Sequence, residues 1–156
     1  MPKPEILFHK TYLAVIRNSV GTKIYRNFYL KIDGKVVDAA KNGACSCAFF
    51  VSNILHMFPA FALVKEPHLT VASTVADLKN QGWTEIKKPL AGAILVWEEK
   101  LFGNSRNKHI GFYIGNNKAI SNDSQSGSPA VHHWTYGEKN GKPVRKVEMI
   151  LWHPRF

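Results

Sequence analysis

The chain has 156 residues, of which 45% are hydrophobic and 21% are charged, as expected for one globular domain with its own hydrophobic core. No apolar run approaches the roughly eighteen residues of a membrane-spanning helix. Lys and Arg outnumber Asp and Glu by 21 to 11, a net charge of +10. This charge predicts an anionic partner or environment, such as nucleic acid, an anionic membrane surface or an anionic cell-wall polymer. We expect a single domain over residues 1–156 and a monomer.

The first forty residues carry a predicted hairpin and no signal-peptide pattern. A basic segment, an apolar block and a small-residue cleavage site do not follow one another in the order of a leader. The compartment stays open: retention in the cell, loss of a leader and export by another route are all compatible. Residues 6–16 predict either a strand or a short helix. Residues 25–38 predict a β-hairpin that turns at Asp33–Gly34.

Residues 44–58 predict the central helix of the domain, because apolar side chains cover most of its circumference. Both cysteines, Cys45 and Cys47, fall in its predicted first turn. Free N–H groups and the positive end of a helix favour a thiolate there. The two side chains point about 200° apart, so we expect no disulfide between them. Because free Cys is also a common packing residue, the helix alone leaves a structural and a nucleophilic role open.

The remainder of the chain is predicted to be one helix followed by strands. The predicted elements are a helix over residues 70–81 with Gly82 as its C-cap, a buried strand over 89–98, an exposed loop over 100–108, a hairpin over 109–122 turning at Asn116–Asn117, and two further strands over 130–136 and 145–152. A Cys-bearing helix followed by an antiparallel sheet is an α+β layout.

A cysteine nucleophile needs a base, and His109 is the best placed of the seven histidines. It begins an apolar strand directly after a polar segment, although a histidine at a strand start is more often a simple surface residue. Ser121, Asn122 and Asp123 end the next strand of the same hairpin, and pairing brings them back beside His109. One of these three residues is therefore expected to orient the imidazole.

Three segments resemble one family of enzymes: CAFFV at residues 47–51, AGAILVW at 91–97 and HIGFYIGNNKAIS at 109–121. They resemble the NlpC-like cell-wall cysteine peptidases and the related CHAP amidases, over about residues 40–135. The resemblance implies a papain-like fold, in which a central helix presents the cysteine against an antiparallel sheet carrying the histidine. It also implies a thiol hydrolase acting on peptide or amide bonds, with peptidoglycan as the usual substrate and no cofactor.

The cysteine motif departs from the family form, Asp-Cys-Ser-Gly followed by an apolar residue and Val. Residues 45–46 copy the Cys-Ser pair, but Cys47 is the cysteine with an apolar residue and Val at plus three and plus four. We therefore assign the nucleophile to Cys47 and a packing role to Cys45. The family's common Pro-Gly-Asp segment reads Ala-Gly-Ala at residues 91–93, so an acidic residue is absent there.

The polar residue that orients the histidine in the family falls at Ser121, with Asn122 next to it. An amide accepts from an imidazole N–H better than a flexible hydroxyl, so we predict Asn122, with Ser121 second and Asp123 third. The predicted mechanism is attack by the Cys47 thiolate on an amide carbonyl, proton donation by His109 to the leaving amine, and hydrolysis of the acyl-enzyme. Backbone N–H groups, including that of Cys47, would stabilise the oxyanion.

The sequence supports two other classes of function less strongly, metal binding and nucleic-acid binding. No second close pair of ligands accompanies the two cysteines, so we expect no metal site; His132 and His133 point to opposite faces of a strand, so at most one of them can join any site. Nucleic-acid binding is permitted by the charge, but no helix-turn-helix, RNP-like or zinc-finger pattern occurs. The alternative function is a basic non-catalytic module that binds nucleic acid or an anionic cell-wall polymer. Trp134 is a candidate cleft residue.

Overall fold

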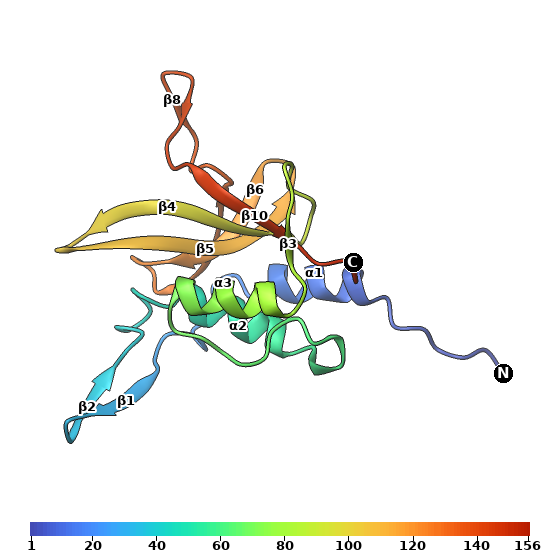
Figure 1. The fold of residues 1–156 in the computed structure, drawn as a ribbon, viewed down its shortest axis with the longest axis horizontal. Helices are drawn as coiled ribbons and strands as arrows, with labels where there is room; N and C mark the ends of the chain where they lie inside the picture. Colours follow the sequence, from blue (N-terminus) through green and yellow to red (C-terminus); the bar gives the residue numbers. More distant parts are fainter.

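Three α-helices lie against one face of a six-stranded antiparallel sheet in the computed structural model, which describes residues 1–156 (Figure 1). The helices are α1 (Phe8–Asn18), α2 (Cys47–His56) and α3 (Val71–Asn80), with a short 3-10 helix at Pro59–Phe61. The sheet has the order β3-β10-β4-β5-β6-β7. Its strands are β3 (Thr84–Glu85), β4 (Ile94–Phe102), β5 (Ser105–Gly115), β6 (Lys118–Asp123), β7 (Ser128–His133) and β10 (Val147–Trp152). The α+β class predicted from the sequence is confirmed.

Helix α2 is the central helix that the apolar pattern predicted, although it begins three residues later than expected, at Cys47. Phe50 and Val51 are fully buried in a cluster of 19 core residues that joins the helices to β4, β5 and β6. Its aromatic members meet edge-on, as in the pair Phe50 and Phe112, whose ring centroids lie 5.5 Å apart. Cys45 lies in the turn that precedes the helix, so only Cys47 is a helical residue.

Residues 6–16, for which the sequence left strand and helix open, belong mostly to α1. Tyr12 is fully buried, and its hydroxyl donates to the carbonyl of Gly92 at 2.9 Å. Gly92 has a φ of +100°, and a side chain there would lie 2.9 Å from the Tyr12 ring. A glycine is therefore required at this point, which explains why Gly92 stands between two alanines just before β4.

The prediction of an exposed loop over residues 100–108 was wrong. β4 continues to Phe102 and β5 begins at Ser105, so the two strands form one long arm with its turn at Gly103–Asn104. Both faces of the arm's outer part meet solvent, so its charged residues do not oppose strand formation, and the sequence shows no apolar alternation there. In Figure 1 the arm extends beyond the helices on the same side as the small hairpin of β1 (Tyr29–Ile32) and β2 (Lys35–Asp38).

The two predicted hairpins are confirmed. β1 and β2 turn at Asp33–Gly34, and β5 and β6 turn at Asn116–Asn117, where both asparagines have positive φ. A further small hairpin, β8 (Glu138–Lys139) with β9 (Lys142–Pro143), lies between β7 and β10. None of the helices combines the length and the hydrophobicity that a membrane-spanning segment requires.

The face of the sheet away from the helices carries a smaller apolar cluster of five buried residues, which includes Trp97 and Tyr113. Trp97 is fully buried, and its indole N–H donates to the carbonyl of Trp134 at 2.7 Å. Trp134 packs edge-on against Tyr113 at this cluster instead of lining a cleft. Beyond this cluster the same face becomes polar, and the candidate site begins there.

Candidate active site

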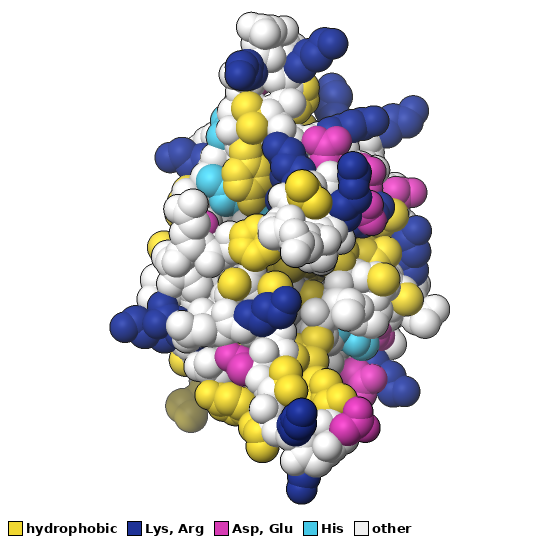
Figure 2. Space-filling view, turned by 90° about the vertical axis from the view of Figure 1, so that its left-hand side faces the viewer, with side chains coloured by type: hydrophobic (Ala, Val, Ile, Leu, Met, Phe, Trp, Pro, Cys, Tyr) yellow, Lys and Arg dark blue, Asp and Glu magenta, His cyan; other side chains and the backbone are white.

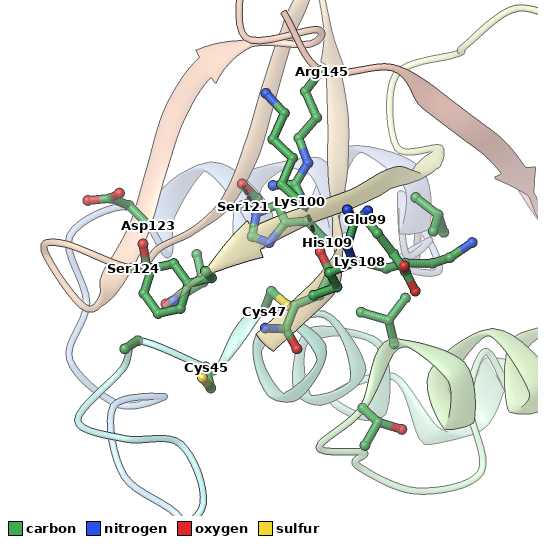
Figure 3. Close-up of a pocket in the computed structure, with 18 of the residues that line it drawn as sticks. Cys45, Cys47, Glu99, Lys100, Lys108, His109, Ser121, Asp123, Ser124 and Arg145 are labelled. Carbon is green, nitrogen blue, oxygen red and sulfur yellow. Dashed lines mark hydrogen bonds between the residues drawn. The ribbon is translucent and has the colours of Figure 1, made fainter. Parts of the chain in front are cut away.

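A cavity of about 900 Å³ opens between the start of α2, the start of α3, the β4–β5 arm and the ends of β6 and β7. Its walls include all the residues that the sequence proposed for catalysis, Cys47, His109, Ser121, Asn122 and Asp123, together with Cys45, to which the sequence assigned a packing role. Figure 3 shows Cys47, His109 and Ser121 gathered in this cavity, with Cys45 in the turn before the helix. The fold therefore brings the thiol and the hairpin histidine to one concave surface, the usual setting of a catalytic site.

Cys47 is the first residue of α2 and is partly buried. Burial raises the pKa of its thiol, and this outweighs the backbone N–H groups of Ile110 and Ala48 and the positive charge of Arg145, which lower it. The position at the helix start predicted a thiolate, but the neutral thiol is the favoured resting form. The loss of solvation on burial destabilises the thiolate more than the helix start stabilises it. The contact with Ile110 places the sulfur beside the residue that follows His109.

The imidazole of His109 is held in place by one hydrogen bond, between its Nε2 and the hydroxyl of Ser121 at 2.8 Å. The ring lies 5.4 Å from that of Trp97, between centroids. Burial lowers the pKa of His109 to about 3, and the charge of Arg145 adds to this effect. At neutral pH the Cys47 thiol and the His109 imidazole are therefore both uncharged, and the imidazole is free to accept a proton.

The hydrogen bond that the sequence assigned to Asn122 is made by Ser121, the second choice. In the β5–β6 ladder Ser121 lies directly opposite Gly111. Side chains alternate along a strand, so His109, Gly111 and Ser121 share one face, whereas Asn122 lies on the face toward the helices. The face of the strand on which each side chain lies, and not its strength as an acceptor, decides which of the two can reach the ring.

Asn122 instead connects the sheet to the segment before α2. Its Nδ2 donates to the carbonyl of Gly43 at 2.6 Å, and its side-chain oxygen has no partner although the residue is only 3% exposed. A carbonyl can only accept, so this bond fixes the orientation of the amide and leaves the oxygen unsatisfied. A buried acceptor without a donor costs about 1–3 kcal/mol. Asn122 therefore holds the sheet to the segment before α2 through its amide nitrogen, with its oxygen buried and unpaired.

Asp123, the third choice, also makes no hydrogen bond to His109. Its carboxylate accepts from the backbone N–H groups of Gln125 and Ser126 in the turn toward β7. Burial raises the pKa of Asp123, but these N–H groups outweigh it and the pKa lies below its usual range. This side chain stabilises the turn.

Three residues near His109 were not proposed as site residues from the sequence. Ser121 also contacts Nε2 of His132 at 2.7 Å and the hydroxyl of Tyr136 at 3.2 Å. Arg145 donates to the carbonyls of Glu98 and Asn107, and no carboxylate lies within salt-bridge distance of it. Strand alternation predicted that at most one of His132 and His133 could join a site, and the structure shows that it is His132. No local sequence pattern indicated Tyr136 or Arg145.

No group of three or more His, Cys, Asp or Glu side chains is arranged to hold a metal ion. Comparison of the sequence with models of known protein families finds no match, and a search among curated proteins finds none either.

Proposed function

We propose that the protein is a cysteine peptidase or amidase, in which Cys47 is the nucleophile and His109 is the general base and acid. One observation carries this proposal: Cys47 and His109 line the same cavity, and the backbone N–H of Ile110, the residue after His109, acts on the Cys47 thiol by lowering its pKa. The resemblance of residues 40–135 to the NlpC-like peptidases supports the same assignment and a papain-like arrangement of helix and sheet.

The pKa directions define the first step. The resting pair is neutral, so His109 removes the thiol proton as the sulfur of Cys47 attacks the amide carbonyl. The resulting tetrahedral intermediate expels the amine, which takes its proton from the imidazolium of His109 and leaves a thioester on Cys47. His109 then removes a proton from a water molecule, which attacks the thioester and releases the carboxylic acid and the thiol.

The start of α2 supplies a candidate oxyanion site. The backbone N–H of Cys47 is among the first four of the helix, which lack intrahelical acceptors, and it makes no backbone hydrogen bond. A preorganised N–H group of this kind stabilises the charge that develops on the carbonyl oxygen.

The charge of the surface favours an anionic polymer as the environment of the substrate. Figure 2 shows Lys and Arg side chains spread over the whole face from which the β4–β5 arm projects. The arm residues Lys100, Arg106 and Lys108 line the cavity. Since cell-wall polymers are anionic, peptidoglycan is the substrate class that we propose.

The test is digestion of purified peptidoglycan, followed by measurement of newly released amino groups and by mass spectrometry of the fragments. Wild type and Cys45→Ser should release amines at similar rates, whereas Cys47→Ser and His109→Ala should release none above background. Loss of activity in Cys45→Ser with activity retained in Cys47→Ser would reverse the assignment. If no variant cleaves the polymer but all bind it in a salt-sensitive manner, the chain is the non-catalytic basic module instead.

A further inference from the structure

Ser121 is hydrogen-bonded to His109, His132 and Tyr136. The position of the proton in each of these hydrogen bonds can be deduced by starting from His132, at one end of this hydrogen-bonded chain. His132 Nδ1 lies 2.7 Å from the backbone carbonyl oxygen of His133. A carbonyl can only accept, so Nδ1 carries the proton. Burial is the largest of the effects that lower the pKa of His132, so its ring is neutral at pH 7. In a neutral imidazole with Nδ1 protonated, Nε2 is an acceptor.

Ser121 is the next member of the chain. Its Oγ lies 2.7 Å from Nε2 of His132, and because that nitrogen accepts, Ser121 must donate its only proton there. Toward His109 at 2.8 Å and Tyr136 at 3.2 Å the Ser121 oxygen can then only accept. One donated and two accepted hydrogen bonds use the full capacity of a hydroxyl.

His109 is therefore protonated on Nε2, and its Nδ1 is the nitrogen that is free to take a proton. We infer that His132 is a positioning residue, which fixes this tautomer of His109 through Ser121. Without an acceptor at His132, the Ser121 hydroxyl could turn and donate to Nε2 of His109. That would favour the opposite tautomer, in which the nitrogen free of Ser121 is already protonated and cannot serve as a base.

The packing of the chain keeps its members in register. The His132 ring stacks on Tyr136, with centroids 4.1 Å apart and planes at 16°. The Trp97 ring lies 5.6 Å from His132. Opposite Ser121, a side chain at Gly111 would lie 2.6 Å from the Ser121 Cβ, so the glycine is what lets the two strands meet at this point. The hydroxyl has little freedom except rotation.

The charged and titratable neighbours of the two imidazoles favour the neutral forms. They are Arg145 before β10, His133 at the end of β7, Tyr136 in the turn after β7 and Asp123 at the end of β6. The positive charge of Arg145 lowers the pKa of both His109 and His132, whereas Asp123 opposes it in both cases. Because the groups in this hydrogen-bonded chain are neutral, each hydrogen bond can keep one fixed donor and one fixed acceptor.

The tautomers can be measured directly on the full chain with ¹⁵N-labelled histidine, by long-range ¹H–¹⁵N correlation at pH 7. Wild type should show His109 protonated at Nε2 and His132 protonated at Nδ1. His132→Phe keeps a ring to stack on Tyr136 but has no acceptor, so His109 should shift toward the Nδ1-protonated form. His132→Gln offers an acceptor again and should restore the wild-type tautomer, and exposed His56→Gln is the matched control that should change nothing.

A wild-type His109 protonated at Nδ1, or a His109 signal that is unmoved in folded His132→Phe, would overturn the inference. These readouts need no catalysis, so they are separate from the proposed function on which the role as a base rests. The functional readout uses p-nitrophenyl acetate, which transfers its acetyl group to a reactive thiol and releases p-nitrophenolate. Acylation of Cys47 should fall about ten- to a hundredfold in His132→Phe and recover in His132→Gln. If the tautomers behave as inferred but peptidoglycan is not cleaved, the proposed function alone fails.

Discussion

The two faces of the sheet are held together by different forces. The face toward the helices contributes to a core of 19 buried residues, with Ile110, Phe112 and Ile120 all fully buried. The opposite face has an apolar cluster of only five residues, and next to it the hydrogen-bonded chain of His109, Ser121 and His132. We infer that dispersion and burial stabilise the first face, whereas hydrogen-bond direction organises the second. Changes on the helix face should therefore act on stability, whereas changes on the polar face should act on reactivity as well as on stability.

The largest expected effect on stability is that of Phe50→Ala on the helix face. Phe50 is fully buried against Phe112, and removing a buried aromatic ring costs about 3–5 kcal/mol of unfolding free energy. Urea denaturation measures this loss. The matched control is Phe102→Ala near the tip of the arm, where the side chain is 48% exposed and the expected change is within about 0.5 kcal/mol. Equal losses in the two variants would contradict the difference between core and arm.

Gly111→Ala places a methyl group on the polar face. The new Cβ would lie 2.6 Å from the Ser121 Cβ and 3.1 Å from the Trp97 ring, so the strands must separate. Overpacking of this kind costs up to about 3 kcal/mol of unfolding free energy. The acylation rate of Cys47 should also fall, because Ser121 moves away from His109. A variant with wild-type stability and rate would show that the close approach at Gly111 is unimportant.

Acid should destabilise the fold through His109. The folded pKa is about 3 and an unfolded histidine has a pKa near 6.5, so between these values the unfolded chain binds more protons. The contribution of His109 is fully present above about pH 6.5 and is lost as the pH falls toward 3. Between pH 7 and pH 4.5 wild type should lose on the order of 2 kcal/mol more than His109→Gln, measured by denaturation at both values. Parallel losses in the two proteins would contradict a buried neutral imidazole.

The smallest expected effect lies at the base of the β1–β2 hairpin. Asp38 accepts hydrogen bonds from the backbone N–H groups of Phe28, Ala40 and Asn42, and these lower its pKa to about 2. The contribution of Asp38 to stability is present above the unfolded value near 3.9 and is lost as the pH falls through about 2. In Asp38→Asn, the amide protons of residues 39–43 should exchange faster, while those of β5 stay unchanged. Unaltered amide exchange in residues 39–43 would contradict the claim that Asp38 stabilises this segment.

The sequence predicted those parts of the fold that depend on local pattern. Apolar periodicity identified α2, and the turn residues Asp33–Gly34 and Asn116–Asn117 identified two hairpins. The arm of β4 and β5 was missed because strands exposed on both faces lose the alternation that marks a half-buried strand. The start of α2 was placed three residues early, since the turn that carries Cys45 is also apolar.

The candidate site was predictable as a set of residues but not as a set of contacts. Cys47 could be proposed from its position at the start of a helix and His109 from its position at the start of an apolar stretch, and both line the cavity. The strand itself begins four residues before His109, at Ser105. The choice between Ser121 and Asn122 depended on register across a turn, because a shift of one residue exchanges the faces of a strand. His132 reaches the site through pairing of β6 with β7, which no spacing along the chain reveals.

The central claim, that Cys47 is a nucleophile served by His109, is tested most directly by acylation of the Cys45→Ser variant with p-nitrophenyl acetate. Intact-mass and peptide mapping should find the acetyl group on Cys47, and addition of His109→Ala should slow its formation by a factor of about 10²–10⁴. Because the pKa of His109 is about 3, the rate should stay nearly constant from pH 7 to pH 5. Acetylation of Cys47 at an equal rate without His109, or of other residues only, would contradict the claim.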